Sequence, residues 1–189
     1  MPEHTLTLLI GKEEIACTVQ ELARRISRDY EKSRPVLLGV LKGAFVFLAD
    51  LIRHLSIDAV IDFIQISSYG SGTNSSGTFV VRRDIHIDIH DRDVVIVEDI
   101  VDTGATFHFL LDHVRARHPR SLKICALLDK QGRRTQHDPV DYCGLTIPDE
   151  FVVGYGLDCD ERYRCLPDIY ALKIDVPAKS QESCHCESR

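Results

Sequence analysis

The sequence predicts an α/β fold, in which helices flank a twisted and mainly parallel β-sheet. Short apolar runs without polar alternation, such as residues 36–41 and 122–128, are typical of strands covered on both faces. Stretches with apolar residues at helical spacing lie between these runs. Charged residues follow several runs directly, at the edge where open α/β sheets bind ligands.

The helices are predicted where apolar residues recur at helical spacing. A helix at residues 18–30 starts from a capping-box pattern, Thr18 with Glu21, and continues with apolar positions on one face. Residues 44–54 form an amphipathic pattern, and residues 104–117 form a helix that ends before a proline.

The strands are predicted from apolar and β-branched runs bounded by turn residues. They are placed at residues 6–10, 36–41, 59–67, 78–82, 94–97, 122–128 and 169–174. His86, Asp88 and His90 alternate along an extended segment. A metal site there is conceivable, but we interpret the segment as a polar outer strand face without a function.

Composition bounds the class of protein. The 189 residues are 44% hydrophobic and 28% charged, which is ordinary for one globular domain. A net charge of -6 argues against nonspecific nucleic-acid binding. No apolar run reaches the length of a membrane span, and residues 1–4 lack the features of a secretory signal, so we expect a cytoplasmic protein.

The seven cysteines are odd in number and scattered, without a Cys-x-x-Cys pair, so we expect no disulfide framework. Cys125 lies in an apolar run and is interpreted as a small buried hydrophobe. Cys184-His185-Cys186 could bind a soft metal, but the polar residues 178–189 are better explained as a disordered terminal tail.

Residues 94–106 carry the strongest chemical signal. A β-branched run leads into Glu98 and Asp99, and small polar residues from Asp102 to Thr106 then open a helix. Backbone N–H groups at a helix N-terminus suit a phosphate, while adjacent carboxylates suit sugar hydroxyls and Mg²⁺. A ribose with a 5′-phosphate has this layout. The plain alternative is a capped strand–turn–helix with an exposed acidic pair, and it would be preferred for residues 102–104 alone.

This stretch resembles the phosphoribosyl-pyrophosphate signature of the type I phosphoribosyltransferases. Its Glu-Asp-Ile-Val-Asp-Thr-Gly form is similar to that of the hypoxanthine (hypoxanthine-guanine) phosphoribosyltransferases, and further matches extend over about residues 37–172. The resemblance implies the fold of that family, with a small hood lobe over the base. It divides a single domain, residues 1–177, into a core at about 36–140 and a hood from the N-terminal segment and about 140–175.

The resemblance also implies a reaction. A 5-phosphoribosyl group passes from phosphoribosyl pyrophosphate to N9 of hypoxanthine, and of guanine, giving IMP or GMP and pyrophosphate in purine salvage. Asp102 would be the general base for the proton at N7 of the purine. The signature contacts to ribose and phosphate would come from Glu98, Asp99, Asp102, Thr103, Gly104, Ala105 and Thr106.

Further matches concern pyrophosphate. Lys42 alone would be read as a solvated turn lysine, but the Leu41-Lys42-Gly43 triplet is similar to the family's pyrophosphate loop, in which the Leu–Lys peptide is often cis. Lys42 and Gly43 are therefore expected to contact pyrophosphate, and Arg164 matches the family's pyrophosphate-binding arginine. Residues 68–77 alone are a flexible loop, and they resemble the family's mobile lid, whose Ser68-Tyr69 pair would close over pyrophosphate.

The purine contacts are expected from two segments. Lys130 follows a strand and matches the family's lysine that reaches the 6-oxo group of the purine. An ammonium only donates hydrogen bonds, so it suits the 6-oxo oxygen and disfavours the 6-amino group of adenine. Phe151 would stack on the base, and the Val152 backbone would bond its edge. Without the resemblance, Lys130 would be a surface lysine and Phe151 a core residue. Mg²⁺ would be held by Glu98, Asp99 and, through water, Asp158.

Other functions stay open at this point. Some proteins with this signature are RNA-binding regulators of pyrimidine genes, and a third possibility is the same chemistry on xanthine or uracil. The acidic balance and the Lys130 and Phe151 matches favour the 6-oxopurine enzyme, with no nucleic-acid or membrane partner. A homodimer or homotetramer is expected from the resemblance alone.

Overall fold

The computed structural model describes residues 3–68, 79–102, 105–130 and 140–175. A six-stranded sheet forms its centre, in the order β4-β3-β2-β5-β6-β7. All neighbours pair in parallel except β4, which runs antiparallel to β3. The strands are β2 (Val36–Leu41), β3 (Val60–Ser68), β4 (Phe79–Arg83), β5 (Asp93–Val101), β6 (Ser121–Asp129) and β7 (Tyr142–Thr146). The predicted mainly parallel α/β sheet is confirmed.

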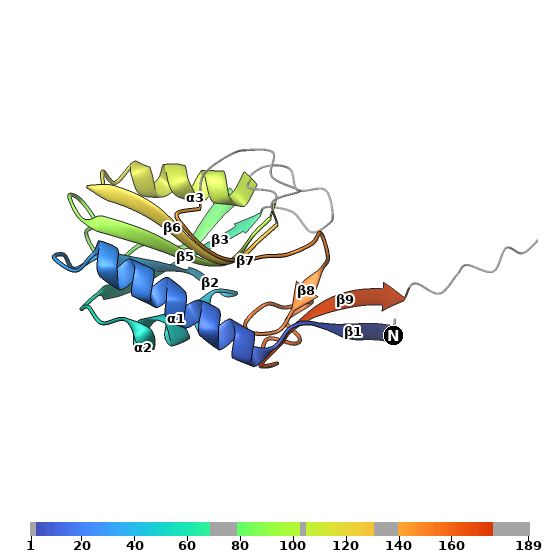
Figure 1. Cartoon of the computed structure of the whole chain (residues 1–189). Coiled ribbons are helices and arrows are strands. Elements are labelled where there is room, and N and C mark those ends of the chain that lie inside the picture. The colour runs from blue at the N-terminus through green and yellow to red at the C-terminus, as the bar shows by residue number, and fades with distance from the viewer. Residues whose placement is uncertain (1–2, 69–78, 103–104, 131–139, 176–189) are drawn as a thin grey trace, which may run out of the picture.

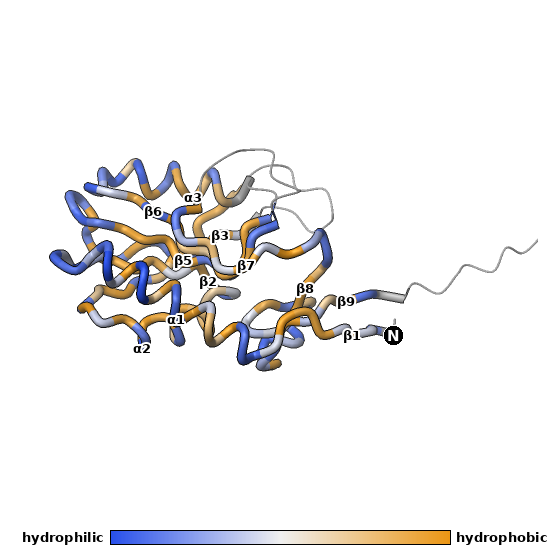
Figure 2. Tube along the Cα trace, in the orientation of Figure 1, coloured by the Kyte–Doolittle hydropathy of each residue, from blue (hydrophilic) through white to orange (hydrophobic). Residues whose placement is uncertain are grey.

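Helices cover both faces of this sheet (Figure 1). Helices α1 (Lys12–Asp29) and α2 (Phe45–His54) lie on one face, and α3 (Ala105–Arg115) lies on the other. The central strands are therefore apolar on both sides, as the hydrophobic colouring along β5 and β6 shows (Figure 2). This explains why their sequences show no polar alternation.

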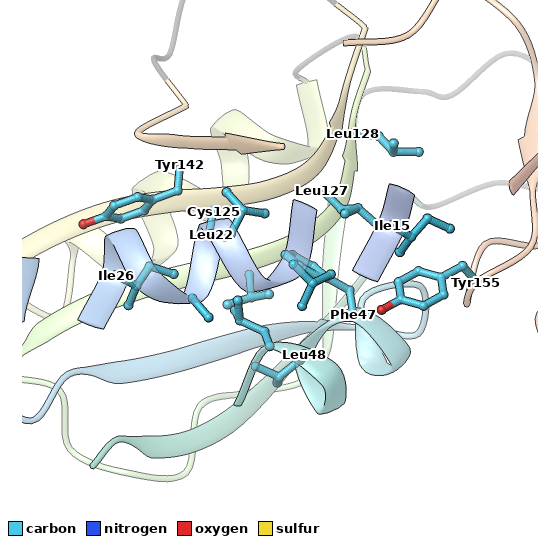
Figure 3. Packing of buried hydrophobic residues seen from close by; sticks show 14 of the residues in the cluster. Ile15, Leu22, Ile26, Phe47, Leu48, Cys125, Leu127, Leu128, Tyr142 and Tyr155 are labelled. Carbon is cyan, nitrogen blue, oxygen red and sulfur yellow. The ribbon is translucent and has the colours of Figure 1, made fainter. Parts of the chain in front are cut away.

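Alternate residues of each strand enter two separate hydrophobic clusters. Leu37, Val95 and Cys125 face α1 and α2, whereas Leu38, Ile96 and Ile124 face α3. In the first cluster, Leu22 and Ile26 of α1 and Phe47 of α2 pack on the same side of the strands (Figure 3). Cys125 is fully buried there, which agrees with its interpretation as a small hydrophobe.

Helix α1 begins six residues before the start that we predicted, at Lys12 rather than Thr18. The capping-box prediction was wrong, because the Thr18 hydroxyl donates to the Glu14 carbonyl within the helix at 2.9 Å. The apolar face extends back to Ile15, which is buried. The first N–H is capped from elsewhere in the chain, since Lys12 N donates to Asp168 Oδ1 at 2.7 Å.

A second, antiparallel sheet lies beside the first, with strand order β1-β9-β8. It joins the N-terminal strand β1 (Glu3–Ile10) to β9 (Ile169–Asp175), with β8 (Val152–Val153) on the far side of β9. The short β7 and β8 were not predicted. Both termini of the described chain leave from this sheet (Figure 1).

The interpretation of residues 84–90 as a strand face was also wrong, since the segment contains no strand. Ile85 and Ile89 are buried against α3, and the Asp62 carboxylate accepts bonds from two backbone N–H groups of the segment, those of His86 and Ile87. Across the described ranges, no helix is both long and apolar enough to cross a membrane.

Candidate functional site

The predicted site residues gather at one edge of the large sheet. Strands β2, β5 and β6 are parallel neighbours, so their carboxyl ends meet at the same edge. Lys42 follows β2, Asp102 follows β5, and Lys130 follows β6. Glu98 and Asp99 lie inside the last half of β5 rather than after it.

The loop after β2 packs directly on one of these carboxylates. A Cβ atom added to Gly43 would lie 1.6 Å from Asp99 Oδ2, so only glycine fits beside this side chain. The Gly43 carbonyl in turn lies 2.3 Å from where a Cβ of Gly156 would stand. The Leu41–Lys42 peptide is cis, as the resemblance implied. The loop after β2, strand β5 and the segment around Gly156 therefore meet at Gly43.

Asp99 is a buried residue, and Glu98, although partly exposed as a residue, buries one of its carboxyl oxygens. Burial, reinforced by the charge of Asp99, raises the pKa of Glu98 well above its ordinary value. Burial raises the pKa of Asp99 to about 6, although the bond from the Ile100 N–H and the charge of Arg164 act against it. Glu98 Oε2 is buried with no hydrogen-bond partner in the described part of the chain. Such oxygens need a cation or a hydroxyl donor to offset their desolvation.

Asp102 and Lys130 form an ion pair at this edge. Lys130 Nζ lies 3.5 Å from Asp102 Oδ2. The Lys130 side chain is only 6% exposed, whereas that of Asp102 is 36% exposed. The Lys130 backbone N–H donates to the Val101 carbonyl at 3.0 Å, which continues the β5–β6 pairing up to these two residues. Lys130 is thus not the surface lysine of the plain alternative.

Arg164 is held from three sides. Its Nη1 donates to the Gly156 carbonyl at 2.7 Å, and its Nη2 lies 2.8 Å from Asp158 Oδ1 and 3.2 Å from Glu161 Oε2. Glu161 also pairs with Lys42 at 2.7 Å. These bonds, that to Lys42 foremost, lower the pKa of Glu161. The structure thus brings Lys42 and Arg164 to one carboxylate.

Glu161 was missed by the sequence reasoning. The only signal was its position three residues before Arg164, and such spacing is common between charged residues in turns. The partner Lys42 lies 119 residues away, so no local pattern contains this contact.

Phe151 and Val152 differ in exposure. Phe151 is 54% exposed as a residue, so it is available to a ligand and is not the core residue of the plain alternative. Its carbonyl accepts a bond from Leu172 N at 2.7 Å, which fixes the segment to β9. Val152 is buried in β8, where it pairs with Ala171.

Several residues predicted to contact the phosphoribosyl group or pyrophosphate lie outside the described ranges. Tyr69, Thr103 and Gly104 lie outside the described residues, as do the tail 178–189 and most of the loop 68–77. Ser68 ends β3, and Ala105 and Thr106 open α3, but their side chains are also outside the described part.

The predicted metal ligands do not form a closed cage. No group of three or more His, Cys, Asp or Glu side chains within the described ranges is arranged to hold a metal ion. The two oxygens of Asp158 are engaged by Arg164 and by the Glu161 N–H. The buried, unpartnered Glu98 oxygen and the neighbouring Asp99 are hard oxygen donors of the kind that Mg²⁺ prefers, and Mg²⁺ usually keeps several waters. The residues present therefore fit this ion.

Comparison with known proteins agrees with this geometry. The sequence model of one protein family, the phosphoribosyl transferase domain, matches residues 10–160 of this chain. The chain is 45% identical over 177 residues to the hypoxanthine-guanine phosphoribosyltransferase of Bacillus subtilis, covering 93% of this chain and 98% of that protein. A crystal structure of a hypoxanthine-guanine phosphoribosyltransferase from Bacillus anthracis superposes with a TM-score of 0.84 at 45% identity, over 90% of this chain and 99% of that one.

A longer relative contains a similar segment. The chain is 42% identical over 169 residues to the bifunctional protein TilS/HprT of Listeria monocytogenes. The match covers 89% of this chain but only 26% of that protein, so the chain spans about a quarter of its length.

Proposed function

Since this chain belongs to the phosphoribosyl transferase family, we propose that it transfers 5-phosphoribosyl from phosphoribosyl pyrophosphate to N9 of hypoxanthine and guanine. The products are IMP or GMP and pyrophosphate, and the role is purine salvage. One observation carries the proposal: the buried donor Lys130 meets the carboxylate of Asp102 at the sheet edge that also holds Glu98 and Asp99.

Lys130, Asp102, Phe151 and Val152 form the base end of the site. The Lys130 ammonium donates to the 6-oxo group, and the Asp102 carboxylate takes the proton from N7 as N9 bonds to C1 of the ribose. The exposed ring of Phe151 stacks on the purine, and the backbone of Val152 bonds its edge. The segments of the second sheet form the hood over the base.

The neighbouring residues bind the phosphoribosyl group and pyrophosphate. Glu98 and Asp99 hold the ribose hydroxyls, and residues 102–106 hold the 5′-phosphate at the start of α3. Lys42 and Arg164 stabilise the charge that develops on pyrophosphate as its bond to C1 breaks, with Gly43 allowing close approach. Ser68 and Tyr69 close over the leaving group.

Mg²⁺ is the proposed cofactor. Glu98, Asp99 and, through water, Asp158 would hold it, and it would neutralise charge on the departing pyrophosphate. We also propose that the protein acts in the cytoplasm as a homodimer or homotetramer, which light scattering and cell fractionation test.

A panel of bases tests the function. Purified protein is supplied with phosphoribosyl pyrophosphate, Mg²⁺ and one base at a time, and nucleotide formation is followed by chromatography. Hypoxanthine and guanine should react, whereas adenine should not, because the Lys130 ammonium has no acceptor for a 6-amino group. If only uracil or only xanthine reacts, that base is the substrate in place of hypoxanthine and guanine. If no base reacts, the proposed function is rejected. Filter binding with RNA checks the regulator alternative.

A further inference from the structure

Glu161 stands between the two cations assigned to pyrophosphate. Its Oε1 accepts a bond from Lys42 Nζ at 2.7 Å, and its Oε2 lies 3.2 Å from Arg164 Nη2. A single carboxylate thus engages the ammonium and the guanidinium with separate oxygens. A phosphate group of pyrophosphate would use the same two donors, because it offers several acceptor oxygens at a similar spacing.

The backbone places Glu161 there by an unfavourable turn. Cys159 and Arg162 exchange backbone hydrogen bonds of 3.2 and 3.1 Å, so Asp160 and Glu161 are the central residues of a two-residue turn. Their φ angles are 53° and 58°, in the left-handed region that asparagine and glycine favour. The Glu161 N–H donates to Asp158 Oδ2 at 2.8 Å, which fixes the turn. The carboxylate therefore occupies a position that a glycine would fill at less backbone cost.

The contact of Glu161 with Lys42 is exposed to solvent, so a ligand can displace it. The side chains of Lys42 and Glu161 are 53% and 63% exposed, so this pair is weak and screened by salt. Pyrophosphate carries more negative charge than one carboxylate and can displace it. Arg164 keeps its bond to the Gly156 carbonyl and its pair with Asp158 when Glu161 leaves, so the guanidinium stays in position.

We propose that Glu161 is an internal competitor of pyrophosphate, which occupies Lys42 and Arg164 in the unliganded protein and weakens the binding of phosphoribosyl pyrophosphate and pyrophosphate. This inference rests on the proposed function, because it uses the pyrophosphate contacts assigned there. By returning to the two cations, the carboxylate also favours release of the product. Glu161 thus lowers the affinity of the site for the leaving group rather than supporting its neighbours.

A supporting role predicts the opposite result. If Glu161 only held Lys42 and Arg164 in place, its neutral variant would bind pyrophosphate more weakly. If it competes, E161Q binds pyrophosphate more tightly, by roughly threefold to tenfold, because the ligand no longer has to displace a carboxylate from Lys42 and Arg164. The direction of the change therefore separates the two roles.

Calorimetric titration with inorganic pyrophosphate and Mg²⁺ is the direct test. E161Q and E161G should each lower the Kd about threefold to tenfold. Glycine adopts the positive φ of this position without strain, so E161G should fold as the wild type does. E21Q removes one negative charge from an exposed pair with Arg24 on α1 and should leave the Kd unchanged. In steady-state kinetics, E161Q should lower KM for phosphoribosyl pyrophosphate without raising kcat.

The outcomes are distinguishable. Equal or weaker binding of pyrophosphate by both Glu161 variants, with wild-type binding intact, overturns the competitor role and leaves the proposed function standing. Folded wild-type protein that binds no pyrophosphate with Mg²⁺ overturns the proposed function, and this inference with it.

Discussion

Lys130 Nζ lies 3.5 Å from the Asp102 carboxylate, although 28 residues separate them in sequence. The contact exists because β5 and β6 are parallel neighbours, with Val101 paired to Asp129 one residue before each partner. The proposed donor to the 6-oxo group and the proposed acceptor of the N7 proton are thereby held together. Each proposed role concerns a different atom of the purine and can be tested separately.

Asp102→Asn should lose most turnover while keeping nucleotide binding. The amide preserves the shape of the side chain but cannot take the N7 proton, and a general base contributes about 10²–10⁴ in rate. The measurements are kcat with hypoxanthine and the Kd of IMP. Turnover within a few fold of wild type would remove Asp102 from this role.

Lys130→Ala should weaken hypoxanthine binding far more than phosphoribosyl-pyrophosphate binding. A hydrogen bond from a charged donor contributes about 1.5–3 kcal/mol, which is roughly 10- to 100-fold in Kd. Calorimetry with each ligand separates the two effects. Lys12→Ala is the matched control, since it removes an exposed lysine at the start of α1. Equal losses for both ligands would contradict a role confined to the base.

Gly43→Ala should damage both the fold and the activity. The new Cβ would lie 1.6 Å from Asp99 Oδ2, so this buried carboxyl group or the loop after β2 must move. Such overpacking costs about 1–3 kcal/mol in free energy of unfolding. Denaturant titration and kcat/KM for phosphoribosyl pyrophosphate are the measurements. Gly11→Ala, whose new Cβ would lie 3.7 Å from Glu13 Oε2, should keep full activity.

Acid stability should depend on Asp93, at the end of β5 opposite the site. Hydrogen bonds from Arg120 and Ser121 lower the pKa of Asp93 to about 2. A lowered pKa in the folded state gives stability that is present above the unfolded pKa near 4 and is lost as pH falls towards 2. The shift corresponds to about 2 kcal/mol.

The test is chemical denaturation at several pH values. Asp93→Asn should lower the free energy of unfolding by about 2 kcal/mol at pH 7, and the difference from wild type should shrink between pH 4 and pH 2. Glu31→Gln, at an exposed position of the α1–β2 connection, should show neither effect. A difference that stays constant with pH would mean that Asp93 acts through packing rather than through its charge.

The strands and the signature were predictable because their patterns are local. Residues 36–41 are apolar throughout, which required a strand covered on both faces, and the structure covers β2 on both faces. The carboxylates and lysines could be assigned to one edge because parallel strands share their carboxyl ends. The start of α1 could not be predicted, since its first N–H is capped by Asp168, 156 residues away.

By itself, the sequence determined the alternation of strands and helices, the acidic pair in β5 and the resemblance carried by residues 94–106, because each depends on neighbours along the chain. Only the tertiary structure decided that Gly43 packs on Asp99, that Lys130 is buried against Asp102, and that Glu161 bridges Lys42 and Arg164. These contacts join segments that lie far apart in sequence. Their distances, burial and shifted pKa values arise only when the sheet brings those segments together.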